Sequence, residues 1–225
     1  MVRAVPPQRH EDPATKLYYY ESPNARTACA VARHLDAPVE FERIDLTAGE
    51  HRRPDYLALN PNGKVPTLVD GDRVLWESPA IACHLALKAG SPLWPSAPEQ
   101  QIEVLRWNHW NAAHFNRHAG ALFFEHIAKP IFGLGAPDPA VVEEANKHLR
   151  HFAKVLDAHL QSRRYLLGDS LSVADFSVAA MLPWQRAARL PLDGYAGLGE
   201  WYARLEALPA WRQPYPDAGA VDMAA

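Results

Sequence analysis

A proline-rich stretch divides this chain into two halves of different character. Residues 91–98 read Ser-Pro-Leu-Trp-Pro-Ser-Ala-Pro, and three prolines in eight residues exclude a helix there. Before this stretch, short β-prone runs alternate with helical periodicity, whereas no strand pattern follows it. We therefore expect a flexible lead over residues 1–13, an α/β domain over 14–90, a linker over 91–98 and an all-helical domain over 99–225.

The first half predicts the element order β-α-β-(α)-β-β-α. Strands are expected over 16–20, 39–46, 65–69 and 73–76, with helices from 22 to about 36, from 54 to about 60 and from 78 to 90. The opening β-α-β order favours a parallel pair of strands with a right-handed crossover, and Asp70-Gly71 favours a hairpin. Pro66 lies inside the third strand, so this strand is either an edge strand or contains an unusual peptide bond.

The second half predicts helices. They are expected over 99–128, ending at Lys129-Pro130, then from Asp138-Pro139 to about 161, from 172 onward and over 198–208. Ser172 and Asp175 have the spacing of a capping box, so we assign them to helix capping and folding, not to catalysis.

Charge and composition exclude several classes of function. The 23 basic and 26 acidic residues give a net charge of -3, which argues against nucleic acid as a partner. Apolar runs fall far short of the ~20 residues that cross a membrane, and the N-terminus shows no secretory signal, so we expect a cytoplasmic protein without a membrane partner. Cys29 and Cys83 are too few for a disulfide scaffold or a metal cluster, and we expect both as small core residues.

Three motifs together resemble the cytosolic glutathione S-transferase family. They are Asn60-Pro-Asn-Gly-Lys-Val-Pro-Thr-Leu68, Trp76-Glu-Ser-Pro-Ala-Ile81 and Ser172-Val-Ala-Asp-Phe176. Each motif is modest alone, but their order and spacing over residues 16–211 are specific. The resemblance implies an α/β plus all-α fold, with a thioredoxin-like N-terminal domain followed by a helical bundle that carries the electrophile pocket.

The resemblance also implies an activity. A glutathione transferase conjugates the glutathione thiolate to electrophilic, mostly apolar substrates in detoxification, with glutathione as co-substrate, no metal and a homodimeric assembly. Two other functions remain open: a glutathione-dependent peroxidase or isomerase on the same fold, and a non-catalytic glutathione- or ligand-binding protein.

Glu77 and Ser78 are the candidates for the γ-glutamyl end of glutathione. Ser78 stands at an expected helix start, where free N–H groups and the helix dipole favour an anion. Glu77 offers a negative charge to the neighbouring ammonium group. Within this family the bond between Val65 and Pro66 is cis, so the resemblance implies that the Val65 backbone pairs with the cysteinyl part of glutathione.

Lys64 and His51 are the candidates for the glycine carboxylate of glutathione. An ammonium group and an imidazole both suit a carboxylate at the rim of a wet pocket. Arg52 and Arg53 could substitute for His51, because they lie in the same polar loop.

Ser22 is the candidate that stabilises the thiolate. A free thiol has a pKa of about 8.5, so the enzyme must supply a donor to the sulfur anion near the first helix. The run from Glu21 to Arg26 resembles the Ser/Thr-Pro-Asn segment of theta- and nu-type enzymes, and the Asn24 amide is close enough in sequence to help. Tyr18, Tyr19 and Tyr20 are also candidates, and of these Tyr18 and Tyr19 are the alternatives to Ser22, because tyrosine-type enzymes carry their donor near this position.

The subtype follows from one position. Beta-type bacterial enzymes have cysteine where this chain has Arg26, so the resemblance is to a bacterial-type, theta/nu-like serine subtype.

For the electrophile pocket, the helix after the linker offers aromatic side chains that suit planar apolar substrates. They are Trp107, Trp110, His114 and Phe115. His114 and His118 are four positions apart, but no third metal ligand is evident, so no metal site is expected.

Overall fold

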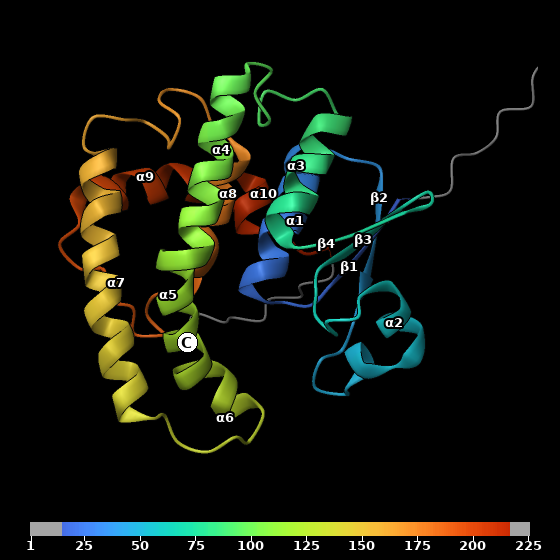
Figure 1. Cartoon of the computed structure of the whole chain (residues 1–225), viewed down its shortest axis with the longest axis horizontal. Helices are drawn as coiled ribbons and strands as arrows, with labels where there is room; N and C mark the ends of the chain where they lie inside the picture. The colour runs from blue at the N-terminus through green and yellow to red at the C-terminus, as the bar shows by residue number, and fades with distance from the viewer. Residues whose placement is uncertain (1–14, 217–225) are drawn as a thin grey trace, which may run out of the picture.

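The computed structural model describes residues 15–216 and contains a four-stranded sheet with its helices, followed by a bundle of helices (Figure 1). The expected flexible lead at 1–13 lies outside the described residues. The strands are β1 (Thr15–Tyr19), β2 (Val39–Arg43), β3 (Thr67–Asp70) and β4 (Arg73–Trp76). The helices of the first half are α1 (Pro23–His34), α2 (Pro54–Leu59) and α3 (Ser78–Lys88).

The sheet has the strand order β2-β1-β3-β4. β1 and β2 are parallel, as the β-α-β order predicts, and the other two pairs are antiparallel. Leu17 lies opposite Phe41 on one side and Leu68 on the other, and burial alternates along β1. α1 and α3 lie together on one face of the sheet, whereas α2 lies on the other, where Tyr56 contacts Tyr18 edge-on with ring centroids 5.8 Å apart (Figure 1).

The proline inside the predicted third strand is explained by a cis bond between Val65 and Pro66. β3 begins only at Thr67, two residues later than expected, and lies between β1 and β4 rather than at an edge. Of the two alternatives for Pro66, the unusual peptide bond is confirmed. The cis residue pair precedes the ladder, so the missing N–H of proline removes no hydrogen bond from it.

The second half begins with α4 (Pro98–Trp110), α5 (Asn116–Phe123) and α6 (Lys129–Ile131), which form one helical run. Two π-helical turns interrupt it, at Asn111–Phe115 and Phe124–Ala128. The expected stop at Lys129-Pro130 is wrong, because the run continues to Ile131. Pro130 is the second residue of α6 and follows directly after the second π-helical turn.

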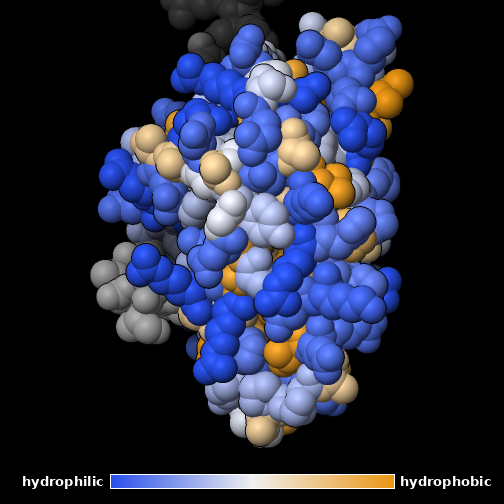
Figure 2. All heavy atoms as spheres, turned by 90° about the vertical axis from the view of Figure 1, so that its left-hand side faces the viewer, coloured by the Kyte–Doolittle hydropathy of each residue, from blue (hydrophilic) through white to orange (hydrophobic). Residues whose placement is uncertain are grey.

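The remaining helices are α7 (Pro139–Leu160), α8 (Val173–Val178), α9 (Ala196–Glu206) and α10 (Pro209–Arg212). Asp138 caps α7 as predicted, accepting a hydrogen bond from the Ala140 N–H at 2.9 Å. The outward side of α7 is largely hydrophilic (Figure 2). α8 is shorter than expected, because a 3₁₀ turn over Ala179–Trp184 follows it and contains Pro183.

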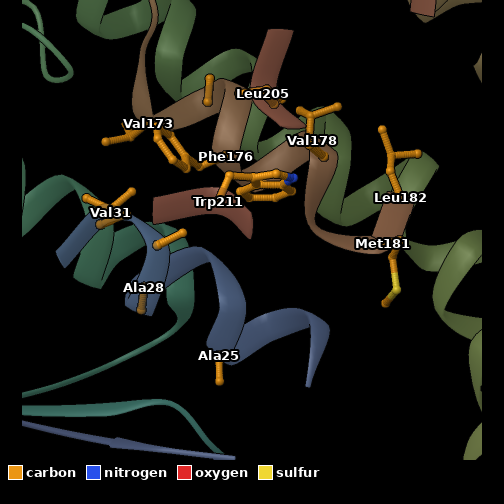
Figure 3. Packing of buried hydrophobic residues seen from close by; sticks show 14 of the residues in the cluster. Ala25, Ala28, Val31, Val173, Phe176, Val178, Met181, Leu182, Leu205 and Trp211 are labelled. Atoms are coloured by element: carbon orange, nitrogen blue, oxygen red, sulfur yellow. The ribbon is translucent and has the colours of Figure 1, made fainter. Parts of the chain in front are cut away.

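The predicted capping box at the start of α8 is confirmed. The buried carboxylate of Asp175 accepts from the Ser172 N–H and hydroxyl, from the Leu166 N–H and from the Trp201 indole, each at 2.9 Å. α8 packs against α1, where Phe176 and Val173 lie near Val31 and Ala28 (Figure 3). One buried core thus runs from the sheet domain into the helical bundle.

The two cysteines lie on the helices of the sheet domain. Cys29 is fully buried in α1, and Cys83 is partly buried on α3; both are free thiols. Burial raises the pKa of the Cys29 thiol strongly and that of Cys83 to about 12, so neither supplies a thiolate at neutral pH. Among the helices of residues 15–216, none combines the length and apolar character of a membrane span.

Candidate active site

Ser22 lies directly before α1, in an extended conformation at the cap position. Its hydroxyl donates to the carbonyl of Tyr20 at 3.3 Å instead of capping the helix. That distance is long for a hydroxyl donor, so a stronger acceptor such as a thiolate can replace the carbonyl. Pro23 follows as the first helical residue. The Ser22 side chain therefore lies at the positive end of the α1 dipole.

A cavity of about 180 Å³ opens beside Ser22, between the sheet domain and the helical run. Its walls are mostly apolar. The sheet domain contributes Tyr20, Glu21, Ser22, Arg43 and Leu46, and the helical run contributes Phe123, Ala128, Ile131 and Phe132. A small cavity with mostly apolar walls that includes the hydroxyl-bearing residues Ser22 and Tyr20 suits an apolar group held next to a polar reacting atom.

The charged groups beside Ser22 are one guanidinium and two carboxylates that lie together. The Arg43 guanidinium donates to both carboxylate oxygens of Glu21, at 2.8 and 3.0 Å, and lies 3.6 Å from a carboxylate oxygen of Asp45. The same guanidinium stacks over the Tyr20 ring, 4.8 Å from its centroid. Burial raises the pKa of Tyr20, so its phenol stays protonated at neutral pH.

The two tyrosines considered as alternatives to Ser22 lie elsewhere. Tyr18 points toward α2, and Tyr19 is fully buried between Phe41 and Tyr215. The tyrosine that lines the cavity is Tyr20. Asn24 is exposed in the first turn of α1. This arrangement favours Ser22 as the donor to a bound thiolate.

The start of α3 differs by one residue from the expectation. Glu77, not Ser78, occupies the cap position, and Ser78 is the first helical residue, 6% exposed. Glu77 has a φ of +74°, a conformation that costs a non-glycine residue about 1–3 kcal/mol. The Glu77 side chain is exposed next to the N-terminus of α3, so its negative carboxylate lies beside the positive end of the helix dipole.

A buried network that the sequence analysis missed holds the loop before the cis bond. The Asn60 amide donates to the Lys64 carbonyl at 2.8 Å and to the Thr67 hydroxyl oxygen at 3.1 Å. The Tyr56 hydroxyl donates to the same carbonyl at 2.6 Å and lies 2.9 Å from the same hydroxyl. The only sequence signal was Asn60 itself, which opens the first motif.

His51 and Lys64 belong to neighbouring segments. His51 lies on the 3₁₀ turn Glu50–Arg52, and Gly63 is so close that an added Cβ would stand 3.2 Å from the His51 carbonyl oxygen. Burial and, less strongly, Arg52 lower the pKa of His51, which favours a neutral imidazole at neutral pH. Lys64 is exposed, whereas Arg53 pairs with Asp55 at 2.6 Å.

The four side chains expected in the electrophile pocket pack toward α7 or into the core. Trp107 contacts His159 with ring centroids 4.5 Å apart, and His114 stacks on Phe152 at 4.7 Å. Trp110 also contacts Phe152, and Phe115 is fully buried. The cavity beside Ser22 is walled instead by residues farther along the same run, from Phe123 to Phe132.

Within residues 15–216, no three His, Cys, Asp or Glu side chains come together to hold a metal ion. His118 stacks on His148 with ring centroids 4.8 Å apart. Burial and, less strongly, neighbouring positive groups lower the pKa of His118.

Comparisons with known proteins agree with this geometry. The model of the glutathione S-transferase N-terminal domain matches residues 13–87, and that of the C-terminal domain matches residues 139–204. Glutathione S-transferase 3 of Zea mays is 40% identical over 203 residues, covering 85% of this chain and 88% of the maize protein. Glutathione S-transferase F10 of Arabidopsis thaliana is 33% identical over 82% of this chain and 89% of its own.

Solved structures show the same similarity. A theta class glutathione S-transferase from Xanthomonas axonopodis pv. citri with glutathione bound is 30% identical, with a TM-score of 0.81 over 90% of this chain and 97% of that one. Maize glutathione S-transferase I in complex with an atrazine glutathione conjugate is 28% identical, with a TM-score of 0.81 over 90% and 96%. The chain therefore belongs to the glutathione S-transferase family, whose members are transferases.

Proposed function

We propose that this protein transfers the glutathione thiolate to small, mostly apolar electrophiles in the cavity beside Ser22. The observation that carries the proposal is the Ser22 hydroxyl, which lines an apolar cavity at the N-terminus of α1 and is not used to cap that helix. Holding thiolate and electrophile together lowers the entropic cost of the reaction, and stabilising the anion raises the fraction of reactive sulfur.

The glutathione molecule would lie along the edge formed by three segments. Its γ-glutamyl carboxylate would accept from the N-terminus of α3 at Ser78, and its ammonium group would pair with Glu77. The Val65 backbone, just before the sheet ladder, would pair with the cysteinyl part. Lys64 and His51 would meet the glycine carboxylate at the rim, where their two segments are already in contact.

The electrophile would occupy the cavity walled by the helical run. Phe123, Ile131 and Phe132 provide apolar surface, and the latter two are also exposed to solvent at 55% and 43%. An apolar substrate would cover this surface and so gain hydrophobic stabilisation. Trp107 and its neighbours toward α7 would instead stiffen the helical run.

We further propose the serine subtype, because Ser22 precedes α1 and Arg26 stands where beta-type enzymes have cysteine. The similar structure from Xanthomonas is a theta class enzyme, while the curated relatives above are plant proteins. A bacterial theta/nu-like assignment therefore stays a proposal. We also propose that the protein is cytoplasmic and that its sheet domain spans residues 14–90, its linker 91–98 and its helical domain 99–225.

A second copy of the chain is the proposed partner. A groove of about 440 Å³ between α3 and α4 is lined mostly by apolar residues, including Ala80, Cys83 and Leu105. Leu105 is 44% exposed, and closed two-fold pairs are the commonest way to cover such a face. Leu105→Glu would place a charge in this groove, and sedimentation analysis should then show monomers where the wild type shows dimers.

The experiment for the activity combines binding and turnover. Calorimetry measures glutathione binding, and a panel of an aryl halide, an organic hydroperoxide and a cis-enone acid measures which acceptor the thiolate attacks. We expect binding and turnover of the aryl halide. Binding without turnover of any acceptor would favour a ligand-binding protein, and turnover of only the hydroperoxide or the enone would favour the peroxidase or isomerase.

A further inference from the structure

The chain segment after α10 returns to the N-terminus of α1. Tyr215, which is 8% exposed, donates its hydroxyl to the Ser22 carbonyl at 2.9 Å. Its ring stacks on the ring of Tyr19, with centroids 5.6 Å apart and an interplanar angle of 10°. A residue 193 positions away in sequence thus contacts the backbone of the proposed thiolate-stabilising residue.

The Ser22 carbonyl accepts a second hydrogen bond. The Arg26 N–H donates to it at 3.0 Å, which is the first hydrogen bond of α1. Two donors from different parts of the chain therefore fix the plane of the peptide that links Ser22 to Pro23. Because the Ser22 side chain branches from the residue that carries this carbonyl, fixing the plane also limits where the hydroxyl can point.

Arg26 ties the same two segments together from the other side. Its guanidinium donates to the Trp211 carbonyl and stacks over the Trp211 ring, 4.8 Å from the centroid. It also lies 5.7 Å from the ring of Trp184, and Trp211 is 1% exposed. The returning segment is therefore anchored at two points, one at Trp211 and one at Tyr215.

We propose that residues 211–215 position the active-site serine, with Tyr215 as a positioning residue that acts through the Ser22 carbonyl. The inference rests on the proposed role of Ser22 as donor to the thiolate. Burial raises the pKa of Tyr215, and the nearby charged groups are Glu21 and Arg26. Its phenol therefore keeps its proton at neutral pH and donates it to the Ser22 carbonyl.

Tyr215→Phe tests the proposal, because it removes the hydroxyl and keeps the ring on Tyr19. Tyr195→Phe is the matched control: the Tyr195 hydroxyl also donates to a main-chain carbonyl, that of Arg150 at 3.0 Å, far along the helical bundle. The readouts are the pKa of the bound glutathione thiol, from thiolate absorbance, together with kcat, KM for glutathione and the melting temperature.

We expect Tyr215→Phe to raise the pKa of the bound thiol by about 0.5 to 1 and to lower kcat about 3- to 10-fold at neutral pH, the effect of one hydrogen bond. KM for glutathione should change less than about twofold, because the groups that hold its two ends are untouched. Tyr195→Phe should leave the thiol pKa and kcat unchanged. A thiol pKa equal in the Tyr215→Phe variant and the wild type would overturn the proposal.

Ser22→Ala separates failure of this inference from failure of the proposed function. If Tyr215 acts through Ser22, adding Tyr215→Phe to Ser22→Ala should raise the thiol pKa no further. Additive effects would show that Tyr215 acts by another route and would contradict the inference. If Ser22→Ala itself left the thiol pKa unchanged, the proposed role of Ser22 would fail first.

Discussion

Asn60→Ala should weaken both the fold and glutathione binding, because Asn60 holds the loop that carries Lys64 and Val65. Its side chain is 2% exposed and donates two hydrogen bonds, to the Lys64 carbonyl and to Thr67. It also accepts two from Asn62, at 3.0 and 3.1 Å. Lys64 and Thr67 keep the Tyr56 hydroxyl as a partner, so the substitution leaves few groups unsatisfied.

The size of the effect follows from these bonds. Each buried neutral hydrogen bond contributes about 1 kcal/mol, and the two bonds with the exposed Asn62 contribute less than the two that Asn60 donates, so Asn60→Ala should cost about 2 to 3 kcal/mol. For a chain of this length that lowers the melting temperature by about 4 to 12 °C. Tyr56→Phe keeps the ring against Tyr18 and removes only the hydroxyl, so about 1 kcal/mol is expected.

Differential scanning calorimetry and steady-state kinetics measure the two consequences. KM for glutathione should rise in Asn60→Ala at a temperature well below the melting point, with kcat changed less, since Ser22 lies in another segment. Asn62→Ala is the control, because it removes an exposed amide from the same loop and only one of the four hydrogen bonds of Asn60. Equal melting temperatures for Asn60→Ala and Asn62→Ala would refute the reasoning that burial of the Asn60 amide matters.

Two further predictions concern pH. A carboxylate bound beside His51 should raise the lowered pKa of this imidazole, so proton uptake should strengthen binding of S-methylglutathione, which has no thiol, as the pH falls from about 8 to about 6. Calorimetry should show this dependence in the wild type and not in His51→Gln; an identical dependence in both would exclude His51. Lys88, 2.6 Å from the Asp70 carboxylate, and His84, 2.8 Å from it, lower the pKa of Asp70. The ionised carboxylate therefore stabilises the folded protein above about pH 4, and this contribution is lost as the pH falls below that value. Asp70→Asn should therefore reduce the melting temperature at neutral pH, with a gap to the wild type that narrows below about pH 4, and a gap constant with pH would contradict this assignment.

Local sequence signals predicted most of the fold. The capping box at Ser172 and the cap at Asp138 depend on residues within a few positions of one another, whereas the parallel pair of β1 and β2 follows from the β-α-β order; all three are confirmed. The family and its two-part architecture are confirmed as well, because the models of both glutathione S-transferase domains match the chain. The predicted helix ends were less accurate. The helical run continues past Pro130 to Ile131, and Glu77 rather than Ser78 occupies the cap position of α3.

Contacts between distant segments could not be predicted. Helical spacing places Trp107, Trp110 and His114 on one face of their helix but does not show which segment covers that face. In the structure, α7 covers it. Nothing in the sequence around Tyr215 connects it to Ser22. That pairing depends on how the whole helical bundle folds back over α1, a property of tertiary packing.

The pKa of glutathione bound to the wild type and to Ser22→Ala decides whether Ser22 stabilises the thiolate. Thiolate absorbance, titrated at saturating glutathione, gives this value for both proteins. We predict a pKa well below the ordinary thiol value of about 8.5 in the wild type and a shift back toward it in Ser22→Ala. The same lowered pKa in both proteins would contradict this account and direct attention to the α1 dipole or to Tyr20.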